Sequence, residues 1–412
     1  MTEICLTASE ELKLIDPKIN LRVSKKTPLS VCARGTRLTK QGLGFPQYLN
    51  DDVIIPGLVR LGYAPEDAEN YSVAASWEPI IPAYGAEVPN LEAFNYPKTV
   101  NAALKRGLTA SENFDELMVF VKEEMRNESA DLIESANRYS PPRDPFLSLF
   151  LRPCIEVGRT YGDGGAQYNN YGFHGVGIAT AADSLEAVER AVFWDKIVSP
   201  EELLAALEAD FAGYEDLRRQ LMAYPKMGNN EDSVDAKAAL LMEEFIRLLD
   251  GVQNNRGGII RPGTGSALEY VSSARCVGAT ADGRPAGQPY GANFSPSVTA
   301  RLNGPLSAII SFTKFDLTGM INGGPFTMER HDTVFRSAEG EKKVAMPVQA
   351  FIARGGHQMR FNSVNRDQLL DAQAHPERHS NLIVRVWGWS GYFVELDLAY
   401  QNHVISRTEF MC

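Results

Sequence analysis

The sequence lacks three features that would each point to a particular class of protein. It has no apolar run near the roughly 20 residues that a membrane-spanning helix requires, and its first residues, MTEICLTASEELKL, lack the basic flank and apolar stretch of a signal peptide. Its five cysteines are scattered, with no Cys-x-x-Cys pair, which argues against a disulfide framework and against a zinc site. These absences predict a cytoplasmic protein with reduced thiols, no membrane partner and no bound metal.

The charge balance is acidic. The chain has 52 Asp and Glu residues against 41 Lys and Arg residues, a formal net charge of -11. Acidic residues are spread along the chain and would repel a phosphate backbone, so nucleic acid is not an expected partner. With 44% hydrophobic and 23% charged residues over 412 positions, the composition predicts an ordered globular protein of two or three domains, or of one large domain.

Stretches with helical periodicity alternate with short apolar strands. The predicted helices cover 53–63, 98–138, 184–193, 200–222 and 235–250, and a short helix is predicted at the end of the chain. Strands are predicted over 19–23 and within 70–82, which runs into a loop. Two glycine-rich passages, 158–179 and 256–297, show little periodicity and are predicted as loops or loop–strand junctions, where function concentrates. This alternation indicates an α/β fold.

Several short motifs match common signatures only in part. The glycine-rich runs 162–166 (GDGGA) and 262–267 (PGTGSA) fit neither a phosphate-binding loop nor a dinucleotide-binding turn. The run SFTK from Ser311 matches Ser-x-x-Lys, but the companion elements of penicillin-recognising enzymes are missing. His375 and His379 are four residues apart without the pattern His-Glu-x-x-His, so we interpret them as part of a solvated turn.

The most informative segment is NLIVRVWGWSGYF, which begins at Asn381 and is followed by VISRT from Val404. A glycine within an apolar strand usually marks a bulge or a close backbone approach. Here, however, the order of residues resembles the signature of glycyl radical enzymes, in which an Arg-Val-x-Gly-(Tyr/Trp)-Ser run precedes a terminal helix ending in Ile-x-Arg-Thr. This resemblance implies that Gly388 stores the radical. The residues expected to support its loop are Arg385, Trp387, Trp389 and Ser390.

Further blocks extend the resemblance over essentially the whole chain. They are GGAQYNNYGFHGVGIA, RGGIIRPGTGSA, GATADGRPAGQPYGANFSPS, INGGPFT and ARGGHQMRFNSVN. Together they match only the second half of a typical family member. The implied fold is therefore α/β, the second half of a ten-stranded glycyl radical enzyme barrel, with the radical loop near the carboxy terminus. We expect a half-barrel of the pyruvate formate-lyase-like domain over 1–270, including the thiyl-position loop 70–82, and a glycyl radical domain over 271–412.

The resemblance also implies a chemistry and a set of partners. No bound cofactor is expected, because family members carry a glycyl radical installed by a separate activating enzyme that uses S-adenosylmethionine and an iron-sulfur cluster. A glycine α-carbon has no side chain, so its radical can lie flat between two amides and be delocalised by both. Such a radical implies oxygen sensitivity and anaerobic metabolism. Because half a barrel leaves open sheet edges, we expect a separate amino-terminal half-barrel chain and an oligomeric assembly.

The second essential residue of the family is a cysteine in a Gly-Cys-Val-Glu-Pro context that relays the radical. The corresponding run here is Ala-Ser-Trp-Glu-Pro, which places Ser76 at the relay position. A hydroxyl O–H bond is too strong for a glycyl radical to break in practice. Three explanations of Ser76 remain. The serine replaces a native cysteine in a variant made to trap a substrate complex, or the chain is a native subunit with altered chemistry, or it is a family member that has lost turnover. Glu78 corresponds to the family's general base, with a helix-cap or salt-bridge role as the alternative, and an apolar setting would raise its pKa.

The predicted function is that of a glycyl radical enzyme subunit. We expect a radical lyase or decarboxylase that acts on a small organic acid or alcohol, with further substrate-pocket candidates in Trp77, His174 and His357. One alternative is radical carbon–carbon bond formation by addition to fumarate, as in the alkyl- and arylsuccinate synthases. Another is an inactive subunit that only completes a barrel, because Ser76 stands in place of the cysteine.

Overall fold

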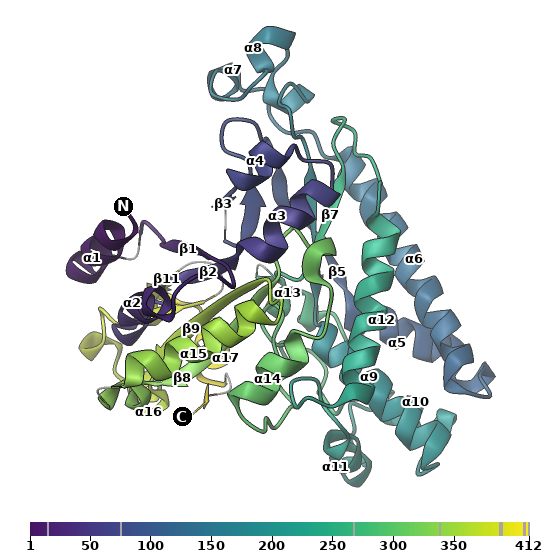
Figure 1. The fold of residues 1–412 in the computed structure, drawn as a ribbon. Coiled ribbons are helices and arrows are strands. Elements are labelled where there is room, and N and C mark those ends of the chain that lie inside the picture. Colours follow the sequence, from purple (N-terminus) through teal and green to yellow (C-terminus); the bar gives the residue numbers. More distant parts are fainter. Residues whose placement is uncertain are drawn as a thin grey trace.

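The computed structural model describes residues 1–14, 16–74, 76–266, 268–337, 339–386, 390–406 and 409–410. The strands of this part of the chain form two separate sheets and two short hairpins (Figure 1). An α/β architecture is therefore present, whereas closure into a ten-stranded barrel stays a prediction. Among the described residues, no helix is both long enough and apolar enough to cross a membrane.

The larger sheet has five strands. In order across the sheet they are β1 (Asn20–Val23), β2 (Gln47–Asn50), β9 (Gln358–Val364), β8 (Pro325–His331) and β12 (Glu409–Phe410). All neighbouring pairs are parallel except β2 and β9, which are antiparallel. A helical layer lies beside this sheet, with α2 against β9. Its members are α1 (Thr2–Leu12), α2 (Leu29–Lys40), α14 (Pro305–Phe312) and α15 (Gly340–Ala353).

The smaller sheet has three parallel strands. They are β5 (Val88–Asn95), β6 (Tyr171–Val176) and β7 (Ile260–Gly263), in that order. Four helices cover it, and the two longest run along one side of the molecule (Figure 1). They are α5 (Tyr96–Gly107), α6 (Phe114–Arg138), α9 (Ile178–Val188) and α12 (Asp232–Leu249). Side chains from both sheets, such as Phe94 and Phe326, belong to one continuous apolar core.

The remaining elements connect or flank these layers. The hairpins are β3 (Ser72–Ala74) with β4 (Glu78–Ile80), and β10 (Ile383–Arg385) with β11 (Ser390–Tyr392). The other helices are α3 (Asp51–Arg60), α4 (Pro65–Glu69), α7 (Pro145–Ser148), α8 (Cys154–Val157), α10 (Pro200–Glu208), α11 (Glu215–Ala223), α13 (Glu269–Arg275), α16 (Arg366–Ala374) and α17 (Leu398–Ser406). Helices α7 and α8 project from the rest of the fold as a lobe (Figure 1).

Several predicted elements agree with the structure. The strand predicted over 19–23 is β1, the helix over 53–63 corresponds to α3, and the helix over 235–250 is α12. Helix α12 buries Val234, Ala238, Leu241 and Phe245 at three- and four-residue spacing, which is the amphipathic pattern of a helix packed on a core.

Two predicted helices are each broken in the structure. The stretch 98–138 contains α5 and α6, because Asn113 caps a new helix by accepting a hydrogen bond from the N–H of Glu116. The stretch 200–222 contains α10 and α11, separated by Asp210 and Phe211, whose positive φ angles of 48° and 61° are incompatible with a continuous helix.

The glycine-rich passage 158–179 contains a central strand, β6, which the prediction of loops or loop–strand junctions did not identify as such. All six residues of β6 are buried, so its two faces do not alternate between apolar and polar. Its glycines are required by close packing: a Cβ on Gly175 would lie 2.5 Å from the ring of Tyr96, and one on Gly172 would clash with Asn322.

Candidate active site

The predicted relay position lies at the tip of a short hairpin. Strands β3 and β4 are antiparallel, and Ala74 pairs with Glu78, so Ser76 and Trp77 form the turn between them. All three residues from Ser76 to Glu78 are buried. The turn therefore carries its side chains within the protein rather than on its surface.

One oxygen of Glu78 holds this turn together. Its Oε2 accepts hydrogen bonds from the backbone N–H groups of Ser76, at 2.8 Å, and of Trp77, at 2.9 Å. Two hydrogen bonds from N–H groups satisfy this oxygen and offset part of the cost of burying a polar side chain. The setting is thus polar, unlike the apolar surroundings that we predicted. The carboxyl holds a hairpin turn and caps no described helix, and its role as general base stays a prediction.

The other oxygen of Glu78 faces an imidazole. His174 Nε2 lies 3.3 Å from Glu78 Oε1, and the same nitrogen is hydrogen-bonded to Asn90 Oδ1. With two oxygens facing Nε2, this nitrogen is assigned the proton. The adjacent strands β6 and β5 position His174 and Asn90, and the ring cannot retreat, because a Cβ on Gly265 would lie 2.7 Å from its Cε1. Glu78 and His174 therefore form a closely packed, buried pair.

Among the predicted pocket candidates, Trp77 and His174 lie with Glu78, whereas His357 packs elsewhere. The side chain of His357 is fully buried against Gly324, where an added Cβ would lie 2.9 Å from the Cβ of His357. Burial lowers the pKa of His357 to about 3, with a small opposing effect from Gln358. The ring is therefore neutral near pH 7.

The predicted radical loop is described only at its flanks. Arg385 and Ser390 are partners in the β10–β11 register, so the residues between them connect the two strands. Ser390 donates a hydrogen bond from Oγ to the carbonyl oxygen of Leu43 at 3.1 Å. Gly388, with Trp387 and Trp389, lies outside the described residues, as does the side chain of Arg385. Their roles stay predictions.

Sequence reasoning missed three buried polar residues that contact the turn. The guanidinium of Arg360 lies 5.6 Å from the centre of the Trp77 indole ring, a cation–π distance. Gln358 donates a hydrogen bond to the carbonyl oxygen of Trp77 in the turn, and Arg261 donates one to the carbonyl oxygen of Pro79 on β4. All three residues are fully buried. They lie in glycine-rich blocks whose polar residues show no periodicity. The shared signal is a long polar side chain two to four positions after a glycine pair, as at 257–261 and 355–360.

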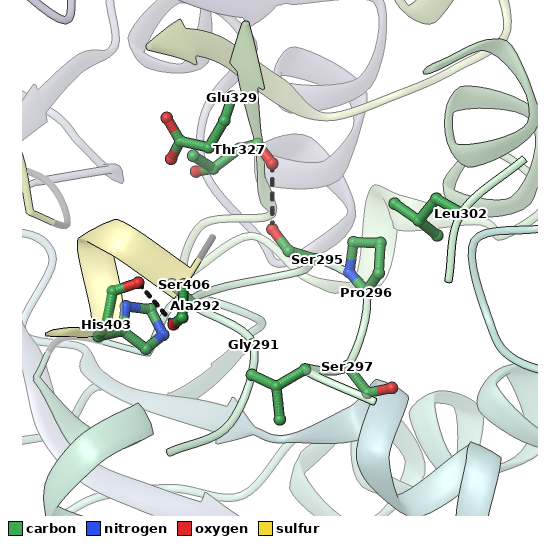
Figure 2. A pocket seen from close by; sticks show the side chains of 11 residues that line it. Gly291, Ala292, Ser295, Pro296, Ser297, Leu302, Thr327, Glu329, His403 and Ser406 are labelled. Carbon is green, nitrogen blue, oxygen red and sulfur yellow. Dashed lines mark hydrogen bonds between the residues drawn. The ribbon is translucent and has the colours of Figure 1, made fainter. Parts of the chain in front are cut away.

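A small cavity is lined by none of the residues of this turn (Figure 2). It has a volume of about 60 Å³ and lies between β8, the loop 291–298 and the end of α17. Thr327 and Glu329 line it from β8, and His403 lines it from α17 (Figure 2). None of the predicted site residues lines this cavity, so it does not identify the substrate pocket.

The described residues also bear on metal binding. Among them, no group of three or more His, Cys, Asp or Glu side chains is arranged to hold a metal ion. His375 Nδ1 and His379 Nε2 instead both contact the carboxylate of Asp371, at 3.0 Å and 2.6 Å. This contact agrees with our interpretation of the two histidines as part of a turn.

Comparisons with known proteins match the whole chain. A family model described as "Pyruvate formate lyase-like" matches residues 1–272, and one described as "Glycine radical" matches residues 291–394, a range that includes Gly388. The trans-4-hydroxy-L-proline dehydratase of Clostridioides difficile is 30% identical over 98% of the chain and 54% of its own length. The (2S)-3-sulfopropanediol dehydratase of Klebsiella oxytoca is 28% identical over 99% and 53%.

A solved structure is similar over the same extent. The glycerol-bound form of the B12-independent glycerol dehydratase from Clostridium butyricum matches with a TM-score of 0.93 and 33% identity, covering 100% of this chain and 55% of the other. The chain thus spans about half the length of the relatives that it matches.

Proposed function

Because the chain belongs to the pyruvate formate lyase-like family, we propose that it is a subunit of a glycyl radical enzyme, a radical lyase or decarboxylase that acts on a small organic acid or alcohol. In this proposal Gly388 stores the radical and position 76 relays it. The observation that carries the proposal is the buried hairpin tip, where position 76, Glu78 and His174 lie in one contact group. The radical itself would come from a separate activating enzyme.

Within this proposal we favour the elimination of water, because the relatives named above are dehydratases. When installed, the radical supplies removal of a hydrogen atom from the substrate carbon that bears a hydroxyl group. Glu78 Oε1 then accepts the proton of that hydroxyl, and His174 Nε2–H donates a proton to the neighbouring leaving hydroxyl. Water departs with the electron pair of the broken C–O bond. The 3.3 Å contact between the two side chains lets Glu78 return its proton to His174.

Ser76 decides whether the protein with this sequence can catalyse the reaction. A sulfur at this position would accept and return the hydrogen atom, whereas the stronger O–H bond of serine does not exchange it. The buried setting of Ser76 and its N–H bond to Glu78 suit a cysteine of similar size equally well. The second candidate function, an inactive subunit that completes a barrel, is favoured by this serine alone.

We further propose that a partner polypeptide supplies the half that the relatives have in addition. The lobe formed by residues 145–157 supports this proposal, because it exposes Phe146, Phe150 and Ile155 by 71%, 60% and 65%. Exposed apolar clusters of this kind mark protein–protein contacts. Purification from the native host is expected to co-isolate a chain whose sequence resembles the first half of the relatives. A stable, monodisperse monomer would contradict this expectation.

Electron paramagnetic resonance tests the central assignment. After anaerobic activation, the protein is expected to give a glycine-centred doublet that is absent in Gly388→Ala. Absence of the doublet with every activating enzyme encoded beside the gene would refute the radical assignment. Turnover of a diol or hydroxy acid after Ser76→Cys, with none in the Ser76 protein, would identify the serine as the block. No turnover in Ser76→Cys despite a full doublet would favour the inactive subunit.

A further inference from the structure

We propose that Gln358 and Arg261 act as a two-sided clamp that fixes the turn 76–78 at the seam between the two sheets. They hold the backbone on either side of Glu78 and thereby set where residue 76 and the Glu78 carboxylate lie. The catalytic meaning of this clamp rests on the proposed function. Its geometry rests on hydrogen bonds alone, so the two can fail separately.

The first arm of the clamp comes from the five-stranded sheet. Gln358 is the first residue of β9 and is fully buried. Its Nε2 donates to the carbonyl oxygen of Trp77 at 2.6 Å, and its Oε1 accepts from the N–H of Gly324 at 3.0 Å. Both ends of the amide are thus used, so the side chain bridges the start of β8 and the turn.

The second arm comes from the three-stranded sheet. Arg261 lies on β7 and is fully buried. Its Nη1 donates to the carbonyl oxygen of Pro79 at 2.9 Å and to the hydroxyl of Tyr63 at 2.8 Å, and its Nη2 donates to Asn322 Oδ1 at 3.2 Å. A rigid, planar guanidinium with several donors holds such a position better than a flexible ammonium would.

Both arms are attached to the same short segment, 322–324. Arg261 contacts Asn322, and Gln358 contacts Gly324. This segment pairs with the three-stranded sheet, since the N–H of Asn322 donates to Pro262 at 2.9 Å, and it continues directly into β8 of the larger sheet. It passes close to the turn, because a Cβ on Gly323 would lie 3.3 Å from the carbonyl oxygen of Trp77. Buried hydrogen bonds therefore link the turn, the segment and both sheets.

The clamped carbonyls are those of the residues directly before and after Glu78. Trp77 O is held from one sheet and Pro79 O from the other, so the α-carbon of Glu78 cannot shift without breaking a buried hydrogen bond. Glu78 in turn holds the N–H of residue 76. Gln358 and Arg261 are thus positioning residues that act on position 76 through the backbone.

The chain offers a matched control for a general packing role. Gln47 lies on β2 in the same five-stranded sheet and is also fully buried. Within the described part of the chain, neither its Nε2 nor its Oε1 has a hydrogen-bond partner. Gln47→Met and Gln358→Met therefore remove the same buried amide from the same sheet, but only the second removes a contact with the turn.

Thiol reactivity tests the clamp on the full chain. A Ser76→Cys background places a thiol on the turn as a reporter. Its alkylation by iodoacetamide is followed over time by residue-resolved mass spectrometry at several pH values around the ordinary thiol pKa of about 8.5. In the Gln358→Met variant of this background we expect alkylation at position 76 to rise about tenfold, since losing one buried hydrogen bond shifts a local opening equilibrium by about that factor. The pH profile should shift with it, because the thiol moves relative to the Glu78 carboxylate.

Three further variants complete the test. Gln47→Met should leave both the rate and the pH profile unchanged. If Gln358→Met does not fold, two milder variants replace it: Gln358→Asn, whose amide is one methylene too short to reach Trp77, and Arg261→Lys. Each should raise alkylation at position 76 and shift its pH profile in the same direction. Equal alkylation rates and profiles in the parent and the clamp variants would overturn the proposal, as would an equal rise in Gln47→Met. These outcomes do not depend on whether a radical forms at Gly388.

Discussion

Replacing Arg261 by methionine removes a buried positive charge beside a buried carboxylate. Arg261 Nη1 lies 3.8 Å from Glu87 Oε1, and both side chains are fully buried. Burial raises the pKa of Glu87, and Arg261 is the main group that opposes this rise. At that separation and an effective dielectric constant of about 20, the attraction is about 4 kcal/mol. Each of the hydrogen bonds that the guanidinium donates adds about 1 kcal/mol.

The electrostatic part of this loss depends on pH. A carboxyl whose pKa is raised by folding binds a proton more tightly in the folded state, so stability falls as pH rises from its unfolded to its folded pKa. In Arg261→Met the pKa of Glu87 rises further, and the penalty grows by up to about 1.4 kcal/mol per pH unit until Glu87 is ionised. The free energy of unfolding should therefore drop more at pH 7.5 than at pH 5.5.

Urea unfolding followed by tryptophan fluorescence measures this difference. The double variant Arg261→Met/Glu87→Gln should recover the pH-dependent part of the loss but not the part due to the missing hydrogen bonds. An equal loss at both pH values, together with no recovery in the double variant, would refute the account of Arg261 as the counter-charge of Glu87.

Three further predictions concern other buried groups. Gly265→Ala places a Cβ 2.7 Å from His174 and should cost about 1–3 kcal/mol in urea unfolding and perturb the imidazole resonance, whereas an unchanged spectrum would contradict the contact. In the wild type, Lys237 Nζ lies 2.6 Å from the buried carboxylate of Glu186. Lys237→Met removes this partner and should lower the free energy of unfolding by about 3 kcal/mol, so an unchanged stability would contradict the ion pair. Burial raises the pKa of Asp183 to about 7, so this residue should lower the free energy of unfolding by about 3 kcal/mol between pH 4 and pH 7, and Asp183→Asn should remove that contribution from the pH dependence.

The sequence predicts the elements that carry a one-sided apolar pattern. Helix α12 shows that pattern, and its predicted and observed ranges agree closely. Strand β6 does not, because both of its faces are buried and its glycines permit contacts with Tyr96 and Asn322 that only the assembled fold reveals. The break between α5 and α6 was equally hidden, since apolar stripes continue on both sides of the cap at Asn113.

The candidate site divides in a similar way. The motif around Glu78 was visible in the sequence, but the return of its Oε2 onto the N–H groups of its own turn depends on the β3–β4 pairing. Asn90 and Gln358 are single polar residues whose partners are 84 and 281 positions away along the chain. No local pattern encodes such distances, so the second layer around the turn emerges only from the packing of the two sheets.

The Glu78 carboxylate makes two contacts at once. Its Oε2 accepts hydrogen bonds from the backbone of its own turn, while its Oε1 faces His174 on the three-stranded sheet. One rigid group therefore joins the backbone that carries residue 76 to the imidazole of His174. A substitution at position 78 changes the shape of the turn and the His174 contact together.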